Sequence, residues 1–265
     1  MIRGLYTSGW SMMANSKKMD VIANNLANVN TNAYKKDTVV FESFPDALIM
    51  RLNDTKSELN PTGNVGKMSL GNDIGEVFTF YKQGSILKTG SNLDFSFQNA
   101  PTESQNSSAF FTIGVADESG NIKEYFTRDG AFTLNSNRQL VTKDGYLVMG
   151  QNGVITMEDE NFSVQDDGTI LNNGNRVDKL LVREFLDTTT LRKYGANLVE
   201  RTAQTQEQPF TGTIAQGFLE QSNVNIVKEM VDMITVTRSY EANQKILQAQ
   251  DGTLEKAVNE IGVVR

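Results

Sequence analysis

The stretch NVNIVKEMVDMITVTRSYEANQKILQAQDGTLEKAVNEI, residues 223–261, places a large apolar or aromatic side chain at every seventh position. The members of this row are Ile226, Met233, Tyr240, Leu247, Leu254 and Ile261. A matching row near the start of the chain consists of Leu5, Met12, Met19 and Leu26. A seven-residue repeat keeps one side of an underwound helix apolar, which is typical of helices that wrap around one another. The sequence therefore predicts two terminal helices that each need a partner.

The composition lacks residue types that many enzyme active sites use. The 265 residues include no His and no Cys, so imidazole bases, thiolate nucleophiles and soft zinc ligands are missing. A net charge of −7 argues against a nucleic-acid partner, because phosphate binding calls for a basic face. We expect no enzymatic activity, no catalytic residues, no cofactor, no metal site and no small-molecule substrate. The length and the 38% of apolar residues predict at least two folding units.

The first helix is expected over residues 2–29 and ends in a segment rich in asparagine. Asn24, Asn25 and Asn28 lie in this segment, where Asn favours helix ends and tight turns. Two interpretations stay open here, a simple turn and hydrogen bonding between subunits. Residues 1–13 lack the continuous apolar region of a cleaved secretory signal, so cytoplasmic residence is the default expectation.

The central part of the chain changes from helical to strand periodicity. Residues 51–75 are polar and rich in glycine, which predicts an exposed loop or arm. From about residue 74 to 186, Asp-Gly and Asn-Gly pairs recur between short strand-like segments, as in antiparallel hairpins. Asp129, Asp144 and Asp167 are interpreted as turn residues. A calcium site or a catalytic carboxylate pair built from Asp159, Glu160, Asp166 and Asp167 lacks the required spacing.

Two local features bear on the C-terminal helix. Ser222 or Asn223 is expected to cap its first turn, and Gly252 predicts a bend or break near Asp251. An alternative places this helix on the chain's own core as an ordinary amphipathic helix.

Three motifs resemble the bacterial flagellar rod and hook proteins. They span Asp20–Thr31 (DVIANNLANVNT), Tyr125–Phe132 (YFTRDGAF) and Leu219–Val224 (LEQSNV), the last continuing through EMV at 229–231, RSYEAN at 238–243 and Lys245. The segment QGSILKTG at 83–90 looks like the family's entry into its β domain. Ser107, Ser108 and Ala109 depart from the common Gly-x-Gly-Phe-Phe strand of the family. The resemblance covers nearly the whole chain, and the distal-rod and proximal-rod branches both carry these motifs.

The resemblance implies an α+β fold. Terminal helices at 1–35 and 211–265 would form a coiled-coil-like assembly domain, 36–75 and 187–210 a connecting or arm region, and 76–186 a central antiparallel all-β domain. The implied function is a structural subunit of the basal-body rod, which builds the hollow drive shaft that transmits torque and conducts exported subunits. A secreted trimeric adhesin or carbohydrate-binding protein is the alternative.

The resemblance also implies partners and a location. The partners would be copies of the chain itself, other rod and hook proteins, the flagellar export apparatus and the surrounding envelope rings. The location would be the basal body, reached without a cleaved signal peptide. Together with the apolar rows, it assigns the assembly interface to Leu5, Met12, Met19, Ile22, Asn24, Asn25, Leu26, Asn28, Ile226, Met230, Met233, Tyr240, Glu241, Asn243, Leu247 and Leu254.

Overall fold

The computed structural model describes residues 2–50, 64–69, 71–98, 107–116, 122–157, 162–172, 174–195 and 197–261. The chain separates into two compact units. We call residues 1–26, 37–78 and 226–265 the helical unit, and residues 27–36 and 79–225 the β unit. Helices and antiparallel strands occupy separate segments, so the expected α+β class is confirmed.

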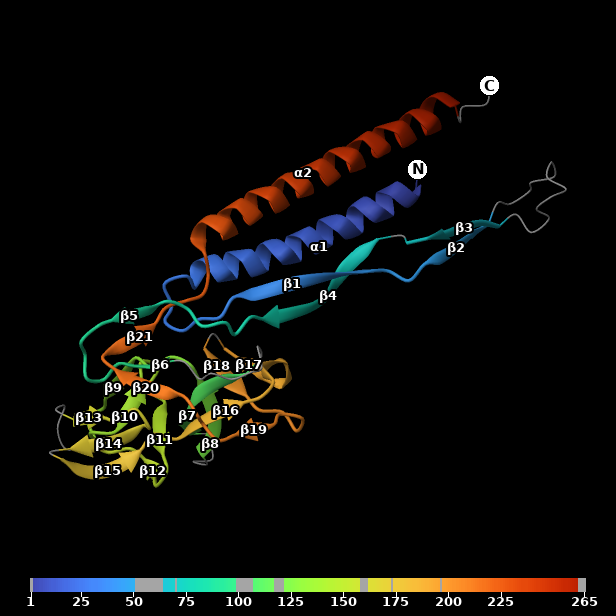
Figure 1. The fold of residues 1–265 in the computed structure, drawn as a ribbon. Helices are drawn as coiled ribbons and strands as arrows, with labels where there is room; N and C mark the ends of the chain where they lie inside the picture. The colour runs from blue at the N-terminus through green and yellow to red at the C-terminus, as the bar shows by residue number, and fades with distance from the viewer. Residues whose placement is uncertain are drawn as a thin grey trace. The chain divides into compact units, whose positions relative to one another are not determined.

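Two long helices, α1 (Ile2–Ala27) and α2 (Ile226–Lys256), run antiparallel within the helical unit (Figure 1). Their pairing follows from contacts along their length. Asn25 near the end of α1 donates to Glu229 near the start of α2, at 3.3 Å. The hydroxyl of Thr237 lies 3.8 Å from the sulfur of Met19. At the other end, the side chain of Gln250 lies against Gly4, where it leaves no room for a Cβ atom.

Four strands complete the helical unit. Strand β1 (Asp37–Ser43) pairs with β4 (Asn72–Thr79), and β2 (Ala47–Met50) pairs with β3 (Asn64–Met68). Helix α1 lies between these strands and α2 (Figure 1). Trp10 packs edge-on against Phe44, with ring centroids 4.9 Å apart. Within the range 51–75, which was expected to form a loop or arm, residues 64–68 and the residues from 72 onward form strands. Residues 51–63 and 70 lie outside the described residues.

The expected cap and the expected break in the C-terminal helix are both wrong. Helix α2 begins at Ile226 rather than directly after Ser222 or Asn223. The Asn223 amide cannot cap it, because that group is engaged with backbone atoms in the β unit. The helix also continues through Gly252, whose cost of about 1 kcal/mol relative to Ala is too small to end it. The departure from α-helical geometry comes later, as a π-helical turn at Ala257–Ile261.

The β unit is built around one ten-stranded antiparallel sheet. Its main path has the order β17-β18-β8-β7-β11-β10-β9, with β12 paired to β11, β16 paired to β7 and β19 paired to β16. Residues 192–208, expected to connect domains, contribute three of these strands. The strand bounds are β7 Ser108–Ala116, β8 Ile122–Thr127, β9 Phe132–Leu134, β10 Leu140–Thr142, β11 Leu147–Gly150, β12 Gly153–Val154, β16 Val182–Phe185, β17 Arg192–Tyr194, β18 Leu198–Glu200 and β19 Glu207–Gln208.

Smaller sheets and one short helix supplement the main sheet. Strands β13, β14 and β15 form a three-stranded sheet, β20 pairs with β6, and β21 pairs with β5. A 3-10 turn, η1 (Thr188–Thr190), follows β16. The bounds are β5 Ile86–Lys88, β6 Phe95–Gln98, β13 Phe162–Val164, β14 Thr169–Asn172, β15 Asn175–Lys179, β20 Thr213–Gln216 and β21 Phe218–Glu220.

Aromatic side chains fill the core of the β unit. The rings of Phe97 and Phe111 stack with centroids 4.3 Å apart, and Phe132 meets Phe111 edge-on at 5.3 Å. Each of these residues is at most 4% exposed. Burial of such rings excludes water from the sheet interior and accounts for much of the stability of the unit.

The Asp-Gly and Asn-Gly turns follow two different rules. Gly145, Gly153 and Gly168 have φ between 85° and 120°, which confirms the left-handed turns expected from the sequence. Gly130 is needed for space instead, because a Cβ atom there would lie 1.9 Å from the carbonyl oxygen of Phe95. The same short pattern thus serves backbone conformation in some turns and close packing in another.

Candidate assembly surface and buried ion cluster

Most members of the apolar rows predicted for assembly are half-buried, on or near the contact between α1 and α2. Glu229, Val236 and Gln250 of α2 are buried or half-buried on the α1 side. Helical spacing of three and four residues places part of the predicted interface on that same side, and these residues are half-buried. They are Met233, Tyr240, Asn243, Leu247 and Leu254 in α2. The matching half-buried residues of α1 are Leu5, Met12, Met19 and Leu26.

The remaining predicted residues have three different environments. Ile226, Met230, Glu241 and Asn24 are exposed on the helices, and Asn28 is half-buried just after α1. Ile22 and Asn25 are 4% and 1% exposed. The side-chain amide of Asn25 donates to the Asp37 carbonyl oxygen at 2.9 Å and accepts from the Asp37 N–H at 3.0 Å. Asn25 therefore joins α1, the start of β1 and, through Glu229, the start of α2.

Helix α2 carries an apolar surface away from α1. We call Ile226, Val227, Met230, Val231 and Ile234 the open face of α2. Their side chains are between 42% and 71% exposed. The spacing of one, three and four residues puts them on neighbouring rows of the helix. Farther along α2, Arg238, Glu241 and Lys245 follow on that side, so the open face lies in the first half of the helix.

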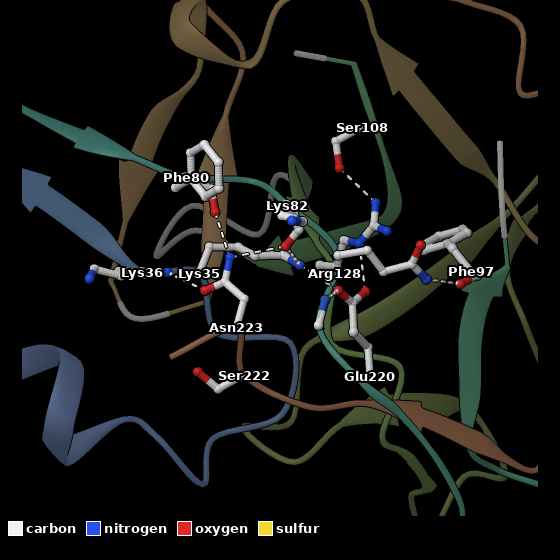
Figure 2. Close-up of polar contacts among 12 residues, drawn as sticks. Lys35, Lys36, Phe80, Lys82, Phe97, Ser108, Arg128, Glu220, Ser222 and Asn223 are labelled. Carbon is white, nitrogen blue, oxygen red and sulfur yellow. Dashed lines mark hydrogen bonds and ion pairs between the residues drawn. The ribbon is translucent and has the colours of Figure 1, made fainter. Parts of the chain in front are cut away.

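A buried ion cluster lies in the β unit. The Glu220 carboxylate pairs through one oxygen with the Lys35 ammonium and through the other with the Arg128 guanidinium, at 2.8 Å from Nε. The three side chains are 2%, 4% and 10% exposed, in the order Glu220, Lys35 and Arg128. Figure 2 shows Arg128 between Glu220 and Ser108, whose hydroxyl accepts from Nη1 at 2.6 Å. Arg128 also donates to the Ala109 carbonyl, at 2.9 Å.

Backbone groups complete the cluster. The N–H of Gly84 donates to the Glu220 carboxylate at 2.9 Å, and Lys35 donates to the Lys82 carbonyl at 3.0 Å. Gly84 must be glycine, because a Cβ atom there would lie 2.0 Å from the Gln221 carbonyl oxygen. The cluster therefore ties together segments around residues 35, 84, 128 and 220.

A second cluster of hydrogen bonds is centred on the Asn223 side chain (Figure 2). Its side-chain oxygen accepts from the Lys36 N–H at 2.8 Å. Its amide nitrogen donates to the carbonyl oxygens of Phe80 and Lys82, at 2.7 and 3.0 Å. One amide thus holds three backbone segments of the β unit together.

Burial and charge act against each other in the ion cluster. Burial lowers the pKa of Lys35 to about 8, although Glu220 acts in the opposite direction, and Arg128 lowers this pKa further. Burial alone would raise the pKa of Glu220, but Arg128 and Lys35 outweigh it and hold that pKa below its usual range. At neutral pH all three groups are charged. Such a cluster is costly to break, because each partner is already removed from water.

The carboxylates considered for catalysis act as turn residues where the structure describes them. The Asp129 carboxylate accepts from the Ala131 N–H at 3.0 Å, and that of Asp167 accepts from the Thr169 N–H at 3.0 Å. Asp159 and Glu160 lie outside the described residues. In the described part of the chain, no three metal-ligating side chains gather at one point. None of the described helices is both long and apolar enough to cross a membrane.

Sequence reasoning missed the ion cluster, although its members lie in or beside the motifs. Lys35 follows the first motif by four residues, Arg128 lies inside the second, and Glu220 lies inside the third. Local sequence does not single out these charges, because Lys35 is followed by Lys36 and Arg128 is followed by Asp129. Their pairing is evident only once the three segments are known to meet.

Comparison with known proteins identifies the family. The family descriptions "Flagella basal body rod protein", "Flagellar hook protein FlgE/F/G D1 domain" and "Flagellar basal body rod FlgEFG protein C-terminal" match residues 5–35, 106–172 and 215–260. The chain is 30% identical to the flagellar hook-basal body complex protein FlhO of Bacillus subtilis, over 100% of both chains.

Rod proteins of both branches are also similar to this chain. Identity is 33% to the basal-body rod protein FlgG of Buchnera aphidicola (subsp. Baizongia pistaciae), over 97% of this chain and 98% of the relative. It is 32% to FlgF of Rhizobium meliloti, over 98% of each. These relatives give the adhesin alternative no support. The chain belongs to the flagellar rod and hook protein family and is a structural subunit of the basal-body rod.

Proposed function

We propose that this rod subunit assembles with copies of itself and with other rod and hook proteins through its terminal helices. The observation that supports this most is the open face of α2. Val227, the most exposed of its five apolar residues, is 71% exposed. Burying a half-exposed aliphatic side chain contributes about 1 kcal/mol. One such contact is weak, but the same contact repeated by every subunit along a helical tube gives a stiff structure.

The proposed assembly surface has an inner and an outer part. The inner part is the half-buried row of Met233, Tyr240, Leu247 and Leu254, which α1 covers only partially. The outer part is the open face, which neighbouring helices would cover. Together the two parts give a coiled-coil-like layer in which each α1 and α2 pair contacts the next. The rows at seven-residue spacing and the open face both support this arrangement.

The mechanical role follows from assembly. A tube of paired helices transmits torque because its contacts are distributed over many subunits, and its lumen conducts later subunits. The subunit would reach the basal body through the flagellar export apparatus without a cleaved signal peptide, and the envelope rings would surround the finished rod. The proposal covers both the distal and the proximal rod, because the FlgG and FlgF relatives are 33% and 32% identical to this chain.

The experiment separates the two parts of the surface. Double variant Val227→Asp/Ile234→Asp changes only exposed side chains, so we expect a normally folded chain that no longer enters the rod. Double variant Met233→Asp/Leu247→Asp changes the half-buried row, so we expect loss of both helix pairing and assembly while the β unit stays folded. Motility in soft agar and recovery of the chain in purified basal bodies measure assembly.

The matched control adds the same charge to the same helix. Gln244→Asp/Gln248→Asp replaces two exposed polar side chains of α2 and is expected to assemble normally. Circular dichroism of each purified variant checks its folding. Normal assembly of Val227→Asp/Ile234→Asp, or equal failure of the glutamine control, would contradict the proposed surface.

A further inference from the structure

A small cavity that is partly open to solvent adjoins the ion cluster in the β unit. Its volume is about 20 Å³, and its lining includes the cations Lys35, Arg128 and Lys193 together with Tyr81, Phe110 and Asn197. Of the described residues that line it, none is an aspartate or glutamate. Glu220 is absent from this lining, so Lys35 and Arg128 contact the carboxylate on one side and border the cavity on the other.

The charges of the cluster do not balance. Lys35 and Arg128 bring two positive charges against the single negative charge of Glu220, which leaves one positive charge in a buried place. Lys193 also lines the cavity, and its ammonium lies 4.8 Å from the Tyr34 ring centroid. An unbalanced buried charge is unfavourable because the protein interior screens it poorly. A negative charge placed in the cavity would remove this imbalance.

We propose that the cavity binds one small monovalent anion of chloride size between Lys35 and Arg128. A cavity needs about 10–15 Å³ to hold one water molecule, so this one admits a single ion slightly larger than water. Sulfate and phosphate, with four oxygens around a central atom, are too large. Burial, and to a lesser degree the Arg128 charge, lowers the pKa of Lys35 to about 8, and a bound anion would favour the charged form of this lysine. The inference concerns the β unit alone and does not depend on rod assembly.

Water is the competing occupant. The side-chain oxygen of Asn197 is buried and has no hydrogen-bond partner in the described protein, so a water molecule could donate to it. Water would satisfy this atom but would leave the positive charge in place. The two occupants therefore differ in one measurable property, the dependence of the site on halide concentration.

The direct test is crystallography of the full chain grown with sodium bromide. Bromide is expected to give an anomalous scattering peak in the cavity, beside Lys35 Nζ and the Arg128 guanidinium. In solution, the unfolding temperature of the β unit should rise with chloride concentration at constant ionic strength, with gluconate as the balancing anion. Sulfate should give no such rise. A cavity that holds only water in the bromide crystal would overturn the proposal.

Two variants check the residues. Lys35→Met removes one of the two cations, and we expect chloride binding at least about tenfold weaker, measured from the ³⁵Cl NMR line width. Lys143→Met removes an exposed lysine from a turn of the same unit and is expected to bind chloride as the parent chain does. Equal binding by both variants would contradict the site. If Lys35→Met fails to fold, the bromide crystal of the parent chain still decides the question.

Discussion

The two units of this chain bury their side chains to different degrees. In the β unit, stacked phenylalanine rings and the ion cluster are at most 10% exposed. In the helical unit, half of the long α2 helix presents Val227, Ile234 and their neighbours to solvent. The difference indicates that the two units have different roles. The β unit buries its core within its own strands, whereas the helical unit keeps apolar surface exposed, where we propose that other chains pack.

Buried polar side chains join distant segments in both units. In the β unit, charges pair across segments that are far apart in the sequence. In the helical unit, the buried amide of Asn25 bonds both Asp37 and Glu229. The Asn25 amide thereby fixes where the two helices and β1 meet.

The largest expected effect comes from breaking the ion cluster. Glu220→Gln leaves Lys35 and Arg128 buried without a counter-charge, so the free energy of unfolding of the β unit should fall by about 3–5 kcal/mol. Urea denaturation followed by tyrosine fluorescence measures this loss. Trp10, the single tryptophan, packs against Phe44 and reports the helical unit separately in the same experiment.

Glu207 provides the matched control for this variant. Its carboxylate also meets two arginines, Arg201 at 2.9 Å and Arg183 at 3.4 Å, but those side chains are 56% and 41% exposed. Exposed ion pairs contribute at most about 1 kcal/mol, so Glu207→Gln should change stability little. Equal losses for the two glutamate variants would show that burial of the cluster does not set its strength.

Asn25 offers the corresponding test in the helical unit. Asn25→Ala removes the amide that bonds both backbone groups of Asp37 and the carboxylate of Glu229. Buried groups left without partners should lower the stability of this unit by about 2–3 kcal/mol. Trp10 fluorescence during urea denaturation measures the change.

Ser16 is exposed on the same helix, which makes it a suitable control. Ser16→Ala should shift the same transition by no more than about 0.5 kcal/mol. If the two alanine variants behave alike, Asn25 does not join α1 to β1 and α2.

The sequence predicted periodic features better than isolated ones. The seven-residue rows located both helices, and the Asp-Gly pairs located the hairpins, because each pattern repeats a local physical requirement. The open face of α2 was harder to find, since Val227 and Ile234 are seven apart but Glu241 ends their row. The ion cluster could not be predicted at all from local patterns, because Lys35 and Glu220 are 185 positions apart and meet only in the folded unit.

Burial of the Asp129 carboxyl group lowers the stability of the otherwise well-packed β unit at neutral pH. Burial raises the pKa of its carboxyl from 3.8 to about 6, although the bond from the Ala131 N–H acts in the opposite direction. Between these two pH values the folded protein binds more protons than the unfolded chain. The contribution of Asp129 to stability is therefore fully present below about pH 4 and is lost as the pH rises to about 6.

Asp129→Asn removes the charge and keeps an oxygen that accepts from the Ala131 N–H. We expect the variant to be more stable than the parent at pH 7 by about 1–2 kcal/mol, with no advantage at pH 3.5. Urea denaturation at several pH values, followed by tyrosine fluorescence, measures this difference. Asp144→Asn, in a neighbouring turn, changes an exposed carboxylate and should shift stability by less than about 0.5 kcal/mol. A stability gain of Asp129→Asn that persists unchanged at pH 3.5 would mean that packing, and not the buried charge, limits this turn. A gain confined to neutral pH would show that even the self-sufficient unit keeps a charged turn residue at the expense of stability.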